Sequence, residues 1–164
     1  MKLTYLAFAL SVLCPVALAG TGPVSGEKKA YLNALKQTHQ VYSDREALIA
    51  EANMLLKHYA LRDGLQAGHV KATNRLYQLS IQHPGELTVR SEHTGTQGIE
   101  IISKRYSVFG LDPYVHYGCD NSFIACELYH PGDNSPWLMI TRDRKGAGDL
   151  AKVISYLLRD LQKG

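Results

Sequence analysis

The stretch that decides the fold is Tyr114–His130, with the sequence YVHYGCDNSFIACELYH. On either side of Asp120-Asn121-Ser122 the chain is rich in aromatic and β-branched residues, which favour strands. The three residues between them have the composition of a tight turn. The stretch therefore predicts a β-hairpin that carries Cys119 on its first strand and Cys126 on its second.

The N-terminus predicts a cleavable signal peptide. Lys2 supplies a positive end, Leu3 to Leu13 form an apolar run, and Ala17-Leu18-Ala19 has the small-x-small pattern that signal peptidase accepts. Pro15 interrupts the run before it reaches the roughly 20 residues of a membrane-spanning helix. We expect cleavage after Ala19 and no membrane span in the mature chain. Lipid anchoring at Cys14 is the alternative, and its neighbours Leu13 and Pro15 both argue against it.

Export places Cys119 and Cys126 in an oxidising compartment, the periplasm or the outside of the cell. A close cysteine pair there forms a disulfide, and no second pair completes a tetrahedral zinc set. We therefore expect a Cys119–Cys126 bridge, no metal site and no cofactor. The bridge closes a short loop, so its entropic effect lies below the roughly 3 kcal/mol expected for a loop of about 15 residues.

A bridge between these cysteines also sets the register of the hairpin. Tyr117 then faces Leu128, and His116 faces Tyr129. Because side chains alternate across a strand, the hairpin has a core face and an outer face. We expect the core face to hold Val115, Tyr117 and Leu128 with the two cysteines. We expect the outer face to hold Tyr114, His116, Glu127 and Tyr129.

Further strands flank this hairpin. Leu87 and Val89 alternate with polar residues, and a turn at 94–98 leads into a second strand-like run from Ile99 to Phe109. The segment 131–136 is dense in turn residues, and Trp137 to Thr141 forms the last strand. We expect these strands to form an antiparallel sheet of about five.

Helices are predicted at both ends of the mature chain. One covers 27–42, and a capping box at Ser43 and Glu46 opens a second that runs through Leu61. Apolar residues at Val70, Leu76, Tyr77 and Leu79 indicate a third, which ends at 83–85. We expect Asp149 to cap a final helix after a solvated turn at 142–148. Its apolar stripe consists of Leu150, Val153, Ile154, Leu157, Leu158 and Leu161.

The expected architecture is α+β, with N-terminal helices, an antiparallel sheet carrying the disulfide-pinned hairpin, and a C-terminal amphipathic helix packed on the sheet. The expected divisions are a signal peptide at 1–19, a flexible leader at 20–26 and a single domain at 27–164. With 45% hydrophobic and 20% charged residues, the chain has the composition of an ordinary globular domain. Its 18 basic and 15 acidic residues are too evenly balanced to indicate nucleic-acid binding.

The sequence favours a protein-binding or inhibitory module of the periplasm, such as an immunity protein that neutralises an envelope-targeted toxin or lytic enzyme. Its partner is then another protein, a secreted effector or a cell-wall enzyme. The outer face of the hairpin is the expected contact surface, because tyrosines are enriched at protein interfaces. The candidate binding residues are Tyr114, His116, Glu127 and Tyr129, with the turn residues Asp120, Asn121, Asp133 and Asn134.

Two alternatives remain open at this point. A small secreted hydrolase would use His116 as an acid/base group with Glu127 as its carboxylate partner. The chain has no G-x-S-x-G motif for a serine nucleophile, and its two mature cysteines pair with each other, so we lean against an enzyme. A structural envelope subunit is the other alternative, and it predicts self-association.

Overall fold

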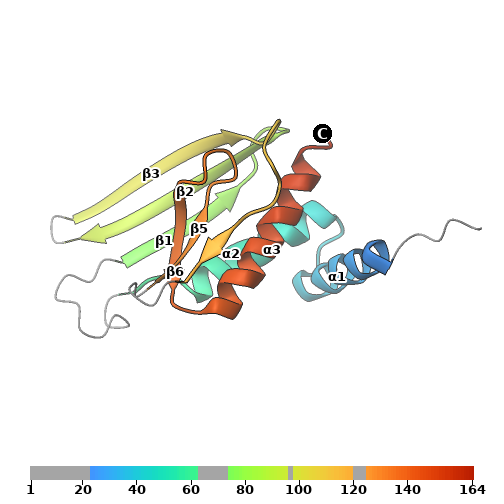
Figure 1. The fold of residues 1–164 in the computed structure, drawn as a ribbon, viewed down its shortest axis with the longest axis horizontal. Helices are drawn as coiled ribbons and strands as arrows, with labels where there is room; N and C mark the ends of the chain where they lie inside the picture. The colour runs from blue at the N-terminus through green and yellow to red at the C-terminus, as the bar shows by residue number, and fades with distance from the viewer. Residues whose placement is uncertain (1–22, 63–73, 96–97, 120–124) are drawn as a thin grey trace, which may run out of the picture.

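The computed structural model describes residues 23–62, 74–95, 98–119 and 125–164, which form an α+β fold (Figure 1). In chain order the elements are α1 (Pro23–His39), α2 (Asp44–His58), β1 (Asn74–Ser80), β2 (Glu86–Gly95), β3 (Gly98–Ser107), β4 (Tyr117–Gly118), β5 (Ala125–Tyr129), β6 (Pro136–Thr141) and α3 (Arg144–Leu161). None of the helices in these ranges has the length and apolar character needed to cross a membrane. The expected signal peptide and Cys14 lie outside the described residues.

The strands form two antiparallel sheets of three, in the orders β1-β2-β3 and β4-β5-β6, so the expected single sheet of about five strands is wrong. The contacts of the residues directly after β3 account for the separation into two sheets. The Gln162 side chain at the end of α3 donates to the carbonyls of Val108 and Leu111, at 2.9 and 2.8 Å. Gly110 between them has a φ of 79°, which a glycine adopts without strain. The chain therefore leaves the first sheet and crosses to the second.

The residues that follow α2 join the two sheets. Ala60 bridges Ile140 of β6, and Leu61 bridges Arg75 of β1. This pairing ends α2 at His58, three positions before the expected end at Leu61. The segment Ala60–Leu61 thus pairs with both sheets and holds them at a fixed relative position.

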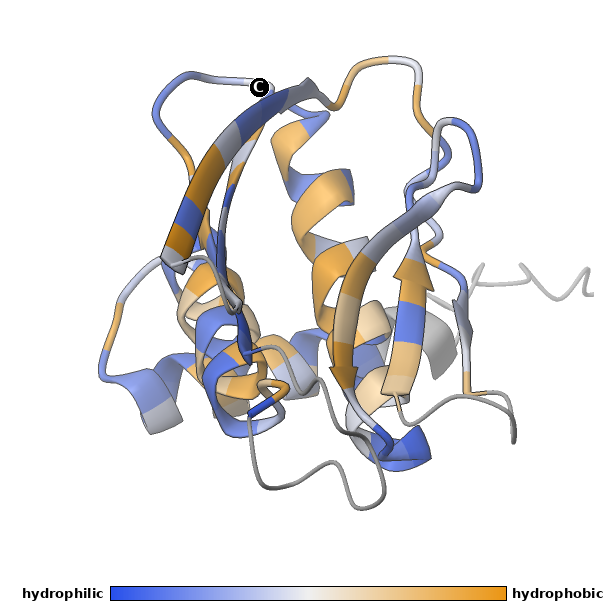
Figure 2. Ribbon diagram, turned by 90° about the vertical axis from the view of Figure 1, so that its left-hand side faces the viewer, coloured by the Kyte–Doolittle hydropathy of each residue, from blue (hydrophilic) through white to orange (hydrophobic). Residues whose placement is uncertain are grey.

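Helix α3 supplies the centre of the core, and its expected apolar stripe is confirmed. All six stripe residues are at most 1% exposed. Figure 2 shows this hydrophobic side of α3 between the two sheets. The Arg45 guanidinium of α2 holds the Asp160 carboxylate of α3 at 2.7 Å, which aligns the two helices.

Asp149 is not the cap of α3, contrary to the sequence prediction. The cap is Asp143, whose carboxylate accepts a hydrogen bond of 2.7 Å from the Gly146 backbone N–H. Asp149 lies in the second turn of the helix and pairs with Lys145, four residues before it, at 2.7 Å. Gly146 and Gly148, which suggested a turn, belong to the helix, and the side chains of Tyr59 and Tyr117 lie against them.

The N-terminal helices follow the prediction closely. The capping box at α2 is confirmed: the Ser43 hydroxyl accepts from the Glu46 N–H, and the Glu46 carboxylate accepts from the Ser43 N–H. Helix α1 begins at Pro23, inside the segment expected to be a leader. His39 and Glu51 link α1 to α2 across 2.6 Å.

The predicted third helix is wrong, because its described residues form strand β1. Leu79 is buried and Tyr77 half-buried on one face, whereas Leu76 is 37% exposed on the other, as alternation in a strand requires. Val70 lies outside the described residues. The predicted break at 83–85 is the turn between β1 and β2, with Gly85 at a φ of 71°.

The disulfide and the register of the hairpin are confirmed. Cys119 is bonded to Cys126, Tyr117 pairs with Leu128, and the Tyr129 N–H donates to the His116 carbonyl at 2.9 Å. The first strand is shorter than expected, because the Val115 N–H bonds to the buried Ser155 hydroxyl of α3 instead of a strand.

The core face of the hairpin is confirmed except at one residue. Val115, Leu128 and both cysteines are buried. Tyr117 is 39% exposed, because its ring extends over Gly148 of α3 instead of entering the core.

Candidate functional site

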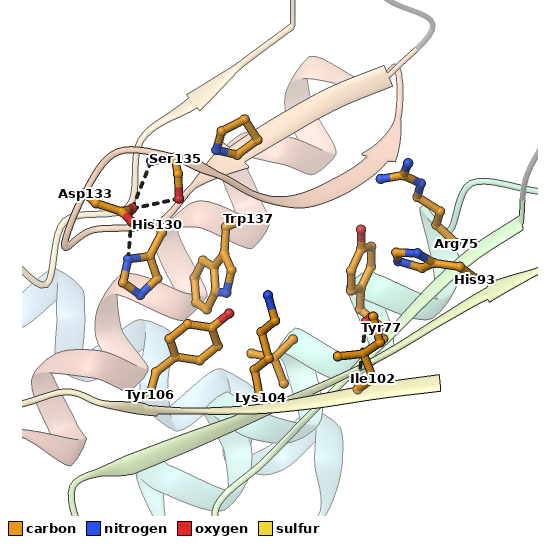
Figure 3. A pocket seen from close by; sticks show the side chains of 13 residues that line it. Arg75, Tyr77, His93, Ile102, Lys104, Tyr106, His130, Asp133, Ser135 and Trp137 are labelled. Carbon is orange, nitrogen blue, oxygen red and sulfur yellow. Dashed lines mark hydrogen bonds and ion pairs between the residues drawn. The ribbon is translucent and has the colours of Figure 1, made fainter. Parts of the chain in front are cut away.

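A cleft of about 370 Å³ lies between the two sheets. Strands β1, β2 and β3 form one wall, and the segment from His130 into β6 forms the other (Figure 3). Its lining residues are Arg75, Tyr77, Val89, Ser91, His93, Ile102, Lys104, Tyr106, His130, Asp133, Ser135, Pro136 and Trp137. Polar, charged and aromatic side chains dominate this lining, in contrast to the aliphatic core beneath it.

The register of the first sheet explains why these side chains converge. Arg75 pairs with His93, and Tyr77 pairs with Ser91 across β1 and β2. Ser91 in turn pairs with Ile102 of β3. Paired residues lie on the same face of a sheet, so alternate residues of all three strands face the cleft.

An aromatic cluster joins the two walls, with Tyr106 from β3 and with His130 and Trp137 from the opposite side. The Tyr106 ring lies 4.9 Å from that of His130 and 5.7 Å from that of Trp137, and the last two rings are 5.5 Å apart. Burial raises the pKa of the Tyr106 phenol. The indole of Trp137 partly offsets this rise, and the charge of Asp133 adds to it. The phenol therefore stays protonated at neutral pH and offers the cleft a hydroxyl donor.

One buried polar atom of the lining, His93 Nε2, has no hydrogen-bond partner among the described residues. A second, Trp137 Nε1, forms no well-aligned hydrogen bond there, although its indole lies close enough to the Tyr106 phenol to lower the pKa of that group. The indole nitrogen is always a donor, and the imidazole nitrogen donates or accepts according to its tautomer. Most buried polar atoms in folded proteins are paired with protein atoms or ordered water, so His93 Nε2 is open to a water molecule or to a bound group.

The cleft carries a positive electrostatic bias. Arg75 and Lys104 contribute cations to its lining, and neither forms an ion pair within the described part of the chain. Figure 3 shows the Lys104 ammonium pointing into the space between Trp137 and Tyr77. Among the described lining residues, Asp133 alone carries a carboxylate.

Asp133 is occupied by its own turn. It accepts hydrogen bonds from the Ser135 N–H at 3.0 Å and the Ser135 hydroxyl at 2.7 Å, and His130 Nδ1 lies 3.3 Å away. These contacts, those of Ser135 first, lower the pKa of the Asp133 carboxyl. In a catalytic triad the histidine lies between the serine and the carboxylate, whereas here the carboxylate lies between the other two. The cluster therefore stabilises the turn and does not activate the serine.

The structure divides the sequence-predicted binding residues between two places. Asp133 lines the cleft, and its neighbour Asn134 occupies the same turn with a φ of 56°. Tyr114 and His116 are exposed on another surface, where their rings contact edge-to-face at 4.7 Å. The predicted turn residues Asp120 and Asn121 lie outside the described residues.

Glu127 and Tyr129 are half-buried on β5. The Tyr129 side chain lies against the Gly118 backbone. His116 and Glu127, the pair expected of a hydrolase, show no hydrogen bond or ion pair with each other in the described structure. This arrangement does not supply an oriented acid/base pair.

A second hollow, of about 320 Å³, lies beside Tyr114. Tyr117 and the α3 residues Lys152, Tyr156 and Arg159 also line it. The buried Ser155 hydroxyl at its base accepts a hydrogen bond from the Val115 N–H and donates one to the Ala151 carbonyl. Unlike His93 Nε2 in the cleft, this hydroxyl already has its partners. The cleft is therefore the stronger candidate.

Comparison of the chain with protein-family models, with curated proteins and with solved structures gives no match. Within the described residues no group of three or more histidine, cysteine, aspartate or glutamate side chains is arranged to hold a metal ion. The sequence did not predict the cleft residues Arg75, Lys104 and Trp137 as site residues. The position of Trp137, the chain's single tryptophan, directly after a run of turn residues could have indicated this site.

Proposed function

We propose that this chain is an exported protein-binding module that receives an acidic segment of its partner in the cleft between the two sheets. The observation that carries the proposal is the buried His93 Nε2, which has no partner among the described residues, in a cleft that Arg75, Lys104 and Trp137 also line. A buried donor without an acceptor costs roughly 1–3 kcal/mol. A carboxylate of a partner would accept a hydrogen bond from the imidazole and neutralise the Arg75 guanidinium.

The lining favours a protein as the partner. Tryptophan, tyrosine and arginine are the residues enriched at energetic hot spots of protein interfaces, and the cleft combines Trp137, Tyr106 and Arg75 in one concave surface. Export is supported by the signal-like N-terminus and by the Cys119–Cys126 disulfide, which is stable in an oxidising compartment. An immunity protein against an envelope-targeted toxin or lytic enzyme has this combination of size, export and a single contact site.

Fluorescence of Trp137 tests the cleft directly, because this residue is the chain's only tryptophan. We expect a glutamate-rich peptide to change the emission and a lysine-rich peptide of equal length to leave it unchanged. Added salt should weaken the response, since the attraction is electrostatic. The variant Arg75→Glu should abolish it, and Lys163→Glu, an exposed change at the C-terminus, should not. Equal responses to both peptides would exclude the proposed electrostatic selectivity.

Capture from an envelope extract identifies the natural partner. A stoichiometric protein bound by wild type and lost with Arg75→Glu supports the proposal. A protein lost only with the double variant Tyr114→Ala, His116→Ala would place the interface on the hairpin surface and overturn the assignment to the cleft. Absence of any captured protein, with the folded oxidised chain as bait, would count against a protein-binding module.

A further inference from the structure

Among the described residues, no strand pairs with the outer edge of β3. This strand has ten residues, pairs with β2 on one side, and ends the strand order of its sheet. Figure 1 shows it along the outer margin of the molecule. The opposite edge of the same sheet is occupied, because Leu79 of β1 exchanges two hydrogen bonds with the Asn53 side chain and the Arg75 N–H of β1 donates to the Leu61 carbonyl. An open edge of this length presents unpaired backbone donors and acceptors that a further strand can bind.

The sequence of β3, GIEIISKRYS, is complementary to itself when reversed. In an antiparallel pair, two facing residues either both point their backbone N–H and C=O groups toward the partner strand or both point them away. A two-fold axis that relates two copies of one strand therefore lies at a residue that faces its own counterpart. With the axis at Ile102, Glu100 of each copy faces Lys104 of the other. This register creates two equivalent ion pairs and pairs nine residues of each strand, 98–106.

Neighbouring registers lack this match. With the axis moved one residue either way, Glu100 faces Ile102 or Tyr106, and Lys104 faces Gly98 or Ile102. With the axis moved two residues either way, two glutamates or two lysines face each other directly, which is destabilising. Neither Glu100 nor Lys104 has an ion-pair partner within the described residues, so both are available for such a contact.

We propose that a second copy of this chain pairs with β3 antiparallel about Ile102, so that two three-stranded sheets become one sheet of six. On the outer face, Ile99 and Ile101 are 63% and 54% exposed in the single chain. The same register places Arg105 of the second copy opposite Ile99, where its aliphatic stem covers the apolar side chain.

The interface uses the same patch on both copies, so it closes as a dimer and does not propagate into a filament. Glu100, Ile102 and Lys104 alternate on the cleft side of the sheet. Both clefts of the dimer therefore open on one side of the joined sheet.

Charge reversal in the purified chain tests the pairing, with molecular mass measured by light scattering or sedimentation. We expect wild type to form a dimer, and Glu100→Lys or Lys104→Glu alone to be monomeric. An equimolar mixture of these two variants should form a heterodimer, because every cation of one chain then faces a carboxylate of the other. Lys163→Glu, away from the edge, should remain dimeric.

Three results would overturn the proposal: a monomeric wild type throughout the accessible concentration range, single variants that dimerise as wild type does, or a mixture that fails to associate. Backbone amide exchange gives an independent readout that needs no substitution. On dimerisation, alternate amides of β3 should become protected, while those of β1 stay unchanged. No peptide ligand is present in these measurements, so their outcome is separate from that of the binding experiment.

Discussion

The side-chain amide of Asn53 forms two hydrogen bonds with the backbone of Leu79. Its Nδ2 donates to the Leu79 carbonyl at 2.9 Å, and its Oδ1 accepts from the Leu79 N–H at 2.7 Å. An adjacent strand would make the same pair of bonds. A helix residue thus replaces a strand at the edge of β1 and holds α2 alongside the sheet.

Loss of this amide should destabilise the protein. We expect Asn53→Ala to lower the free energy of unfolding by about 1–3 kcal/mol, because it leaves a part-buried donor and acceptor of Leu79 without partners. Denaturation by urea measures the change. Asn33→Ala, an exposed substitution in α1, is the control. Equal stability of the two variants would show that the Leu79 groups find other partners.

The two glycines of α3 should respond in opposite directions to alanine. A Cβ at Gly146 would lie 2.5 Å from the Tyr59 ring, so Gly146→Ala should cost about 1–3 kcal/mol through overpacking. A Cβ at Gly148 would lie 3.0 Å from the hydroxyl of Tyr117, the end of a partly exposed side chain that can move. Gly148→Ala should therefore gain up to about 1 kcal/mol from helix propensity. Thermal unfolding of both variants checks the signs, and destabilisation of equal size would contradict them.

Two separate substitutions, at Asp143 and at Asp149, test which residue caps α3. Asp143→Ala should lower stability by about 1 kcal/mol, because the Gly146 N–H loses its acceptor. Asp149→Ala should cost only about 0.2–0.5 kcal/mol, since it removes an exposed pair with Lys145. A larger loss of stability for Asp149→Ala than for Asp143→Ala would support Asp149 as the cap, as the sequence predicted.

Stability should fall in alkaline solution through Tyr31. Burial, and then the charges of Glu51 and Asp149, raise the pKa of this phenol from 10.0 to about 12. Between these values the unfolded chain has lost the proton and the folded chain retains it, so the free energy of unfolding decreases as pH rises.

The variant Tyr31→Phe has no such proton. Its loss of stability between about pH 8 and about pH 11.5 should be smaller than that of wild type by about 1 kcal/mol, after allowance for partial exposure of the ring. Urea unfolding at both pH values measures the difference. Parallel losses in the two proteins would mean that other tyrosines account for the alkaline sensitivity.

Features set by near neighbours were predictable from sequence. The capping box at Ser43 needs only Glu46, and the hairpin register needs only Cys119 and Cys126. The stripe of α3 is likewise a periodic signal within one element. Strand β1 was missed because the spacing of Leu76 and Leu79 fits a helix, and contacts from far along the chain decide otherwise.

The cleft could not be read from sequence for the same reason. Arg75 and Trp137 come from segments far apart in the chain, and no local pattern shows that they share a site. Assignment of the segment around Arg75 to a helix also hid the pairing that turns it towards His93. On the hairpin, alternation sorted Val115 correctly but misplaced Tyr117, because the strand is too short to keep its tyrosine inward.

The joint between the sheets determines when the cleft can exist during synthesis. The backbone N–H and the hydroxyl of Thr141 both donate to the Tyr59 carbonyl, across a separation of 82 positions. Closing so long a loop is slow, since its entropic cost precedes the contacts that it enables. The two sheets therefore cannot be joined until the last strand of the chain is present. A chain that ended before His130 would lack the second wall of the cleft, so the cleft forms only when both sheets are complete.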